Sequence, residues 1–321
     1  MLIIEFYTEP KKFTFHGKKS NYFELQVANW VLTAVTLGFY YPWAKANKLR
    51  YLYQKTEFGG SRFTFHGTGK EMFKGYLKAI VIFIMFYAIV MGISLSGNPE
   101  LVPAGIGVIY LGLALLIPVA LHGSMRYRAS RSSWRGIHFG YRGSLKRLYG
   151  VYFLNLFLTL FSFGIYTPWF VTNLRKEIIG NLRFGDAQFS FEGSASEFFM
   201  ILLKGHLLTI PTFGVYYFFM ARDLYKHFVN NIFLHQNGEY AHLETNITGW
   251  GLAKLEVVNL LILIFTVGLG APLVTVRTMR YIFANTELEG FFDPDGLIQT
   301  EEQYQNATYE DVADMLDLNL V

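Results

Sequence analysis

Apolar residues dominate six long blocks of this chain, and polar or basic residues fill the segments between them. A membrane-crossing helix needs ~20 predominantly apolar residues, and each block reaches about that length. The second and third blocks are joined only by the short link SGNPE, which predicts a tight helical hairpin. The pattern predicts an all-α polytopic membrane protein with six spans: Tyr22–Trp43, Tyr76–Ser96, Leu101–Met125, Tyr149–Phe170, Phe198–Met220 and Leu252–Val276.

Three of these blocks end in one recurring phrase, seen as LGFYYPWAKANKLRY, FGIYTPWFVTNLRKE and VGLGAPLVTVRTMRY. Each copy has a proline four residues after a glycine and a base eight residues after the proline. Proline removes a backbone donor and clashes with the preceding turn, so the phrase is expected to end or kink a helix. The helix-break motif comprises Gly38, Pro42, Trp43, Gly164, Pro168, Trp169, Gly268 and Pro272.

The bases after the motif are expected to lie at an anionic headgroup interface, with the neighbouring aromatic residues in the headgroup layer. Weaker copies of the phrase surround Pro118 and Phe218, and the copy at Pro118 adds a further base. The predicted interfacial bases are Arg50, Arg126, Lys176 and Arg280.

A second phrase, FTFHG, occurs at Phe13–Gly17 and Phe63–Gly67, with FSFEG at Phe189–Gly193. Alternating aromatic and small polar residues predict short β-strands, here interpreted as connectors between helices. The predicted repeat units are about 13–80, 139–206 and 243–290, within a transmembrane domain at 1–290. Two topologies stay open: the repeated helices cross the bilayer fully, or they are re-entrant and the strands pair on one side.

The composition supports a membrane location. Hydrophobic residues make up 52% of the 321 residues and charged residues only 16%, whereas soluble domains carry about 25% charged residues. The chain has no cysteine, which excludes disulfides, zinc–thiolate sites and thiol nucleophiles. The net charge of +4 comes from basic loops beside apolar blocks, as the positive-inside rule produces, so nucleic-acid binding is not expected. No cleaved signal peptide is expected either.

In the first copy of the recurring phrase and in the strand phrase after it, the chain resembles the YjgN family of bacterial inner-membrane proteins, grouped as a domain of unknown function. The resemblance rests on the first copy of the motif: Leu37, Gly38, Pro42, Trp43, Arg50, Tyr51, Thr56, Gly59, Gly60, Phe63, Phe65 and Gly67. The second copy departs at Glu177 and Asp186, and the third has Leu273 in place of the tryptophan. The resemblance implies a polytopic protein of the bacterial inner membrane and supplies no activity or substrate.

Polar residues inside the apolar blocks are the candidate functional residues. Asn29, Asn155 and Asn259 lie thirteen residues before the three prolines, near mid-span. They either hydrogen-bond between helices or form a polar ring around a pathway. Lys204 and His206 lie inside the fifth block. Two interpretations stay open: they act as an ion relay or as a counter-charge for a substrate, or their side chains extend to the membrane interface.

No motif for catalysis, a cofactor or a metal is found. His16, His66 and Glu192 occupy matching positions, yet no close histidine cluster or HExxH motif accompanies them. Neither a GxSxG elbow nor a phosphate-binding loop is present. The acidic tail at 291–321 has no base, and it is expected to fold against the protein's own basic loops or to bind a protein partner.

The leading functional hypothesis is a transporter or channel for a small solute, because repeats with broken helices recur in transporters. The alternative is a non-transporting scaffold that organises an envelope protein or lipid complex. Under either hypothesis the protein lies in the bacterial inner membrane, contacts anionic headgroups and is not an enzyme.

Overall fold

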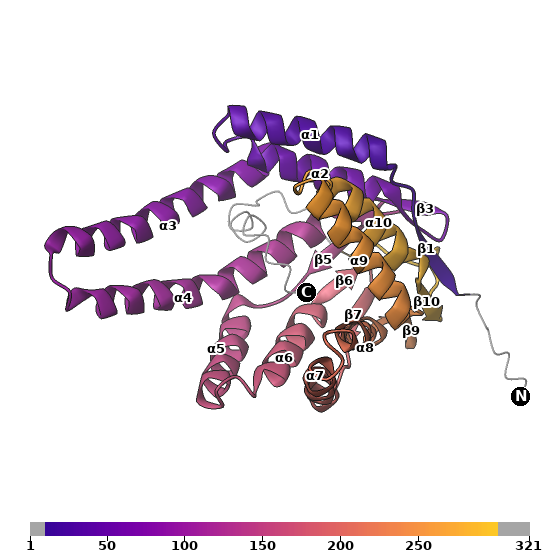
Figure 1. Ribbon diagram of the computed structural model, residues 1–321. Helices are drawn as coiled ribbons and strands as arrows, with labels where there is room; N and C mark the ends of the chain where they lie inside the picture. Colours follow the sequence, from indigo (N-terminus) through magenta and orange to yellow (C-terminus); the bar gives the residue numbers. More distant parts are fainter. Residues whose placement is uncertain (1–9, 301–321) are drawn as a thin grey trace, which may run out of the picture.

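The computed structural model describes residues 10–300. In this part of the chain, strands and helices follow one another in the order β–α–α–β five times (Figure 1). The strands are β1 (Lys11–Phe15), β2 (Thr56–Phe58), β3 (Ser61–Phe65), β4 (Ser132–Trp134), β5 (Ile137–Tyr141), β6 (Leu182–Phe184), β7 (Ala187–Phe191), β8 (Ile232–Gln236), β9 (Glu239–Thr245) and β10 (Thr286–Gly290). The helices are α1 (Lys19–Val35), α2 (Tyr41–Lys55), α3 (Gly69–Ser96), α4 (Leu101–Ser130), α5 (Leu145–Phe161), α6 (Thr167–Ile179), α7 (Ala195–Thr209), α8 (Tyr216–Asn230), α9 (Gly249–Phe265) and α10 (Ala271–Ala284).

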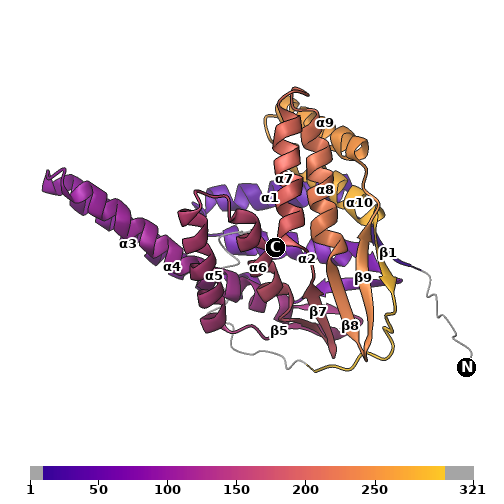
Figure 2. The same cartoon turned by 90° about the horizontal axis from the view of Figure 1, so that it is seen from below.

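The ten strands form a closed antiparallel barrel. Strand β1 closes it, because Phe13 lies opposite Phe58 of β2 while Lys11 lies opposite Leu288 of β10. Consecutive strands are joined alternately by a short turn and by a helix pair, so all turns lie at one end of the barrel and all helix pairs at the other. Figure 2 shows α7 and α8 leaving one end of β7 and β8, and the chain after β10 passing the other end.

The predicted fold class is therefore wrong. The chain is not an all-α protein with strands as connectors, because the strands form the barrel around which the helices are arranged. The cause lies in strand length: each described strand has three to seven residues, and at least one of its partner strands is separated from it by a helix pair. A short strand exposes unpaired backbone groups at its edges, and closure of the barrel removes these edges.

The expectation of six spans is also corrected. Two helices of the described region, α3 and α4, are long and apolar enough to cross a membrane. Each of the other four apolar blocks reverses direction in its second half, so that it holds the first helix and the start of the second helix of a shorter pair. We call these pairs the short hairpins α1–α2, α5–α6, α7–α8 and α9–α10. The prolines Pro42, Pro168 and Pro272 lie in the first turn of the second helix, where the missing N–H costs no hydrogen bond.

The helix pairs form a ring above the barrel. Each pair packs on the next one along the chain, and α1 packs on α10 to close the ring. The hairpin α3–α4, called the long hairpin, projects well beyond the others (Figures 1 and 2).

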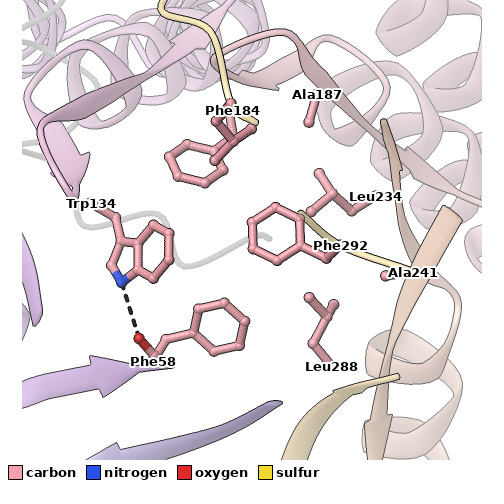
Figure 3. Packing of buried hydrophobic residues seen from close by; sticks show 9 residues of the cluster. Phe58, Trp134, Phe184, Ala187, Leu234, Ala241, Leu288 and Phe292 are labelled. Carbon is pink, nitrogen blue, oxygen red and sulfur yellow. Dashed lines mark hydrogen bonds between the residues drawn. The ribbon is translucent and has the colours of Figure 1, made fainter. Parts of the chain in front are cut away.

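Nine buried side chains fill the turn end of the barrel; we call them the closing cluster. Phe292 lies among them, between Trp134 on one side and Leu234 and Leu288 on the other (Figure 3). The members are Phe58, Trp134, Phe184, Ala187, Leu234, Ala241, Leu288, Phe292 and Leu297.

Polar contacts hold the start of the predicted tail over the turn end. Lys11 Nζ donates to Phe292 O at 2.6 Å, and the Gln236 side chain bonds the backbone N–H and C=O of Asp293. Burial lowers the pKa of Lys11, and the carboxylates of Asp293 and Asp295 act in the opposite direction. Residues 291–300 therefore belong to the barrel, whereas residues 301–321 of the predicted acidic tail lie outside the described residues.

Candidate functional site

The four short hairpins reverse direction through the same turn. A bulky apolar residue with φ near +50° precedes a glycine with φ between +83° and +93°. The glycine N–H donates to the carbonyl five residues earlier at 2.7–2.9 Å, which is the six-to-one bond of a Schellman motif. These turns lie at Leu37–Gly38, Phe163–Gly164, Phe213–Gly214 and Val267–Gly268, which we call the short tips.

A hydroxyl completes each short tip. The residue before the apolar residue is always serine or threonine, and its Oγ accepts the N–H four residues later at 2.7–3.1 Å. The end of the first helix and the start of the second thus find hydrogen-bond partners inside the turn. These hydroxyl residues recur in the sequence as Thr36, Ser162, Thr212 and Thr266, although none of them is among the predicted site residues.

The apolar residue of each short tip is almost fully exposed. The exposed fractions are 89% for Leu37, 97% for Phe163, 98% for Phe213 and 89% for Val267. The left-handed backbone conformation costs a non-glycine residue ~1–2 kcal/mol of conformational free energy. A large apolar side chain that is exposed to water does not offset this cost. The short tips therefore have the chemistry of a surface that contacts lipid, with satisfied backbone groups and apolar side chains.

The tip of the long hairpin differs in chemistry. It consists of exposed residues from Gly97 to Glu100, and the Asn98 side chain accepts the N–H of Glu100 at 3.0 Å. Helices α3 and α4 have 28 and 30 residues, so they are about 42 and 45 Å long at ~1.5 Å per residue. A polar tip thus occurs on the hairpin whose helices exceed the ~30 Å hydrocarbon core.

The three predicted asparagines join the two helices of their own hairpins. Asn155 Oδ1 accepts from Asn173 Nδ2 at 2.8 Å, and Asn29 Oδ1 accepts from Asn47 Nδ2 at 3.4 Å. Asn259 Nδ2 donates to Thr278 Oγ1 at 3.1 Å, and Asn259 Oδ1 accepts from Arg277 Nε at 3.2 Å. All three asparagines are buried and at most 4% exposed. The partners Asn47, Asn173 and Arg277 all lie five residues after the motif proline, a spacing that was present in the sequence.

Replacing Asn155 with leucine is expected to lower the free energy of unfolding by ~1–3 kcal/mol, because the half-buried Asn173 amide loses its partner. Denaturant unfolding of the purified protein measures this effect. Replacing Asn155 and Asn173 together with leucine is expected to restore most of the loss, since no unpaired amide remains. A double variant less stable than the single one would contradict this account.

Lys204 and His206 are both exposed on α7. His206 Nδ1 lies 2.7 Å from Leu202 O of the same helix. The residue between them, Gly205, faces the partner helix, and a Cβ there would meet the Met220 side chain at 2.1 Å. In this hairpin, close packing of glycine on methionine takes the place of the asparagine pair.

The tryptophans of the helix-break motif contact the next hairpin in the ring. Trp43 lies near Phe73 of α3, at 5.2 Å between ring centroids, and Trp169 lies 5.5 Å from Phe199 of α7. Gly69 leaves room for Trp43, because a Cβ there would lie 2.4 Å from the indole. In the helix-break motif, the proline thus starts the second helix of its own hairpin and the tryptophan contacts the next hairpin.

Two of the predicted interfacial bases donate hydrogen bonds to backbone carbonyls beside the barrel. Arg50 Nη2 donates to Gly67 O at 3.2 Å, and Arg280 Nη2 donates to Gly17 O at 3.0 Å, in both cases at the junction of a strand with its helix. Arg126 is half-buried in α4, and Lys176 is exposed on α6. Contact of these bases with headgroups stays a prediction.

Charged pairs join the two helices of a hairpin near the barrel. Arg131 Nη2 lies 3.1 Å from Glu71 Oε1, and Arg147 Nε lies 2.8 Å from Glu177 Oε2. Burial raises the pKa of Tyr141 to about 12, and the Glu177 carboxylate adds to that rise. These charged pairs fix where the hairpins α3–α4 and α5–α6 leave their strands.

The outer face of the barrel carries the histidines of the FTFHG phrase. His16 Nε2 lies 3.1 Å from Glu57 Oε2, and His66 Nε2 lies 2.8 Å from Ser133 Oγ. Glu192 pairs with His235 at 3.8 Å. Across residues 10–300, no three His, Asp or Glu side chains gather in a group that could hold a metal ion.

A cavity of about 520 Å³ lies between the strands and the helix ring. Its lining combines residues of β1–β6 with residues of α2, α4 and α10, and none of the predicted site residues is among them. The lining residues are Phe13, Leu52, Tyr53, Thr56, Phe63, Met125, Arg128, Ala129, Ser132, Phe139, Leu182, Met279 and Phe283.

Sequence comparison identifies the family. The profile of DUF898, described as a bacterial protein of unknown function, matches residues 10–225 and 220–315. The chain belongs to this family.

Curated relatives of this DUF898 chain are named inner membrane protein YjgN, which confirms the resemblance drawn from the motif. The protein of Escherichia coli K12 is 35% identical over 161 residues, and that of Salmonella typhimurium LT2 is 28% identical over 171 residues. These alignments cover 50% and 53% of this chain but 38% and 40% of the relatives, so the chain spans less than half of their length. No solved structure matches the chain. The relatives' names support the expected inner-membrane location.

Proposed function

We propose that this protein is an inner-membrane scaffold that holds a closed barrel against one face of the bilayer. The short hairpins enter the lipid from that face and return to it, and the long hairpin crosses. The observation that carries this proposal is the chemistry of the five tips: four are apolar with satisfied backbone groups, and the polar tip belongs to the long hairpin.

Helix length supports this arrangement. The helices of the short hairpins have 13 to 17 residues, which corresponds to about 20–25 Å and is less than the ~30 Å hydrocarbon core. Their tips therefore end inside the lipid, where a polar tip would be costly. The long hairpin brings its tip to the far side, where water hydrates Asn98 and Glu100.

Charge supports a cytoplasmic barrel. The barrel ends of α3 and α4 carry Lys70, Lys74, Arg126 and Arg131, whereas the link from Ser96 to Glu100 has no base. Basic residues beside a span favour the cytoplasmic side. The basic helix ends would then meet anionic headgroups, and the acidic tail would face cytoplasmic protein partners.

The transporter or channel hypothesis receives less support from this geometry. The closing cluster fills the turn end of the barrel, so a path along the barrel axis meets packed aromatic rings. The three asparagines are engaged in bonds within their hairpins rather than around a common path. Transport stays a prediction, as does the absence of catalysis.

Cysteine accessibility tests the proposed topology, since the chain has no native cysteine. Single cysteines replace Phe163 and Phe213 in short tips, Asn98 in the long tip and Glu239 at the turn end of the barrel. A membrane-impermeant maleimide is added to spheroplasts or to inverted vesicles. The Asn98→Cys variant is expected to react only in spheroplasts and the Glu239→Cys variant only in inverted vesicles, while the short-tip cysteines react only after detergent is added.

The outcomes separate the parts of the proposal. Reaction of a short-tip cysteine in intact membranes would place that tip in water and overturn the re-entrant arrangement. Reaction of the Asn98→Cys and Glu239→Cys variants from the same side would show that the long hairpin does not cross.

A further inference from the structure

One position in the second helix of each hairpin contacts the start of the first helix. It lies five residues before the strand that follows the hairpin, and we call the side chains at this position the contact residues. In α3–α4 the Tyr127 hydroxyl donates to Glu71 Oε2 at 3.2 Å, and in α1–α2 the Tyr51 hydroxyl donates to Lys18 O at 3.1 Å. The contact residues are Tyr51, Tyr127, Glu177, His227 and Tyr281.

The other three hairpins make this contact with different chemistry. In α5–α6, Glu177 pairs with an arginine of α5. In α9–α10 the Tyr281 hydroxyl lies at Gly251, where a Cβ would be 2.2 Å away. In α7–α8, His227 Nδ1 lies 3.2 Å from Glu197 Oε2. Of these residue types, histidine is the one whose ordinary pKa places its change of charge between about pH 5 and 8.

His227 is buried among aromatic rings. Its side chain is fully covered, and its ring stacks on that of Phe198 at 5.9 Å between centroids. The rings of Phe191 and Phe228 lie 6.3 and 5.5 Å away. Nε2 lies against Gly193 and has no hydrogen-bond partner among the described residues. The place suits a neutral imidazole, because an imidazolium has two N–H donors and Nε2 finds no acceptor here.

One cation and one carboxylate act on His227. Arg175 of α6 lies over the Phe228 ring, 4.0 Å from its centroid, whereas the Glu197 side chain of α7 is 59% exposed. Helix α9 and strands β8 and β9 also pack on α8, but within residues 10–300 they bring no further charge to bear on His227. Burial lowers the pKa of His227, the Glu197 carboxylate opposes this change, and Arg175 adds to it. Water weakens the attraction of the exposed carboxylate, so burial and Arg175 prevail.

We propose that the hairpin α7–α8 is a pH-sensitive element, in which protonation of His227 separates the start of α7 from α8. The other short hairpins keep their contacts over the same pH range. Acidification of the compartment that holds the barrel thus loosens one hairpin of the ring. The identity of that compartment as the cytoplasm rests on the proposed function, whereas the response itself does not.

Hydrogen–deuterium exchange of the full chain in nanodiscs tests the proposal. The open hairpin takes up a proton on His227 near pH ~6.5 and the closed hairpin only at lower pH, so closure weakens as the pH falls below ~6.5. Protection factors in α7–α8, corrected for the intrinsic exchange rate at each pH, are expected to fall about threefold or more between about pH 7.5 and 5.5.

The same experiment contains its own comparison. The helices of α1–α2, α5–α6 and α9–α10 hold no histidine, so their protection factors are expected to change by less than about twofold. Unchanged protection of α7–α8, or an equal loss in all these hairpins, would overturn the proposal. This comparison uses the wild type and does not depend on the folding of a variant.

The two histidines of α7–α8 provide a variant and its matched control. His227→Tyr introduces the side chain that three other hairpins use at this position, and the pH response is expected to disappear. His206→Gln removes the exposed histidine of α7 and is expected to keep the wild-type response. A response that persists in His227→Tyr, or that disappears in His206→Gln, would assign the titration to another group.

Glu197→Gln gives a readout that a purely structural role would not change. Loss of the carboxylate removes the attraction for a proton on His227, so the loss of protection on acidification is expected to be about twofold larger than in the wild type. An equal effect of this substitution at both pH values would reject the coupling between Glu197 and His227. Exchange does not depend on the orientation of the chain in the membrane, so its failure leaves the proposed topology intact, and maleimide labelling tests that topology alone.

Discussion

Replacing Phe292 with alanine is expected to lower the free energy of unfolding by about 3–5 kcal/mol, the usual cost of removing a large buried ring. Phe292 is 3% exposed, and its ring lies 6.1–6.4 Å from those of Phe58, Trp134 and Phe184. These three residues belong to β2, β4 and β6, so the smaller side chain would leave a space that no single strand can fill. Denaturant unfolding followed by tryptophan fluorescence, which includes Trp134, measures the effect.

Ile298 provides the control for Phe292. It lies in the same segment after β10, but it is 65% exposed. Ile298→Ala is expected to change the free energy of unfolding by less than ~0.5 kcal/mol, as surface substitutions usually do. Equal effects of the two substitutions would show that Phe292 does not stabilise the closing cluster.

Aspartate at two short tips, in the double variant Phe163→Asp/Phe213→Asp, is expected to reduce sharply the amount of folded protein in the membrane. An aspartate in the bilayer interior costs ~2.5–3.5 kcal/mol on insertion scales, so two cost ~5–7 kcal/mol. That sum is comparable to the whole net stability of many domains, ~5–15 kcal/mol. Quantitative immunoblotting of the membrane fraction and thermal unfolding in nanodiscs measure the loss.

Two controls separate lipid contact from a general effect of added charge. Asn98→Asp adds a carboxylate at the polar tip, and Phe163→Leu/Phe213→Leu keeps both short tips apolar. Both controls are expected to accumulate like the wild type. Unchanged accumulation of the double aspartate variant would place these tips in water.

The hairpin turns show how one sequence pattern fits two structures. Gly38 followed by Pro42 marks the end of a helix, and the chain does change direction there. The same residues are compatible with the end of a helix that crosses the bilayer, where the six-span prediction placed them. The choice is made by packing of α1 on α2 and by the bond between Asn29 and Asn47, and the second requires the two helices to be antiparallel.

For the candidate site residues too, the sequence gives the positions and the tertiary structure gives the contacts. Asn29, Asn155 and Asn259 each lie thirteen residues before a motif proline, but their partners are found only when the helices pair. Lys204 and His206 attract attention because ionisable residues are rare in apolar blocks, yet both lie exposed on α7. The cavity could not be predicted at all, because its lining residues come from nine separate helices and strands and are mostly ordinary apolar residues.

The sequence by itself determined the apolar blocks, the strand-like phrases, the positions where the chain reverses and the absence of cysteine chemistry. These features depend on residues close together in the chain, where periodicity and backbone preference act. The tertiary structure alone decided that ten short strands close into a barrel, with β1 paired to β10 across more than 270 residues. It also decided that Phe292 closes one end and that a cavity lies above it, because these contacts form only when distant segments meet and exclude water together.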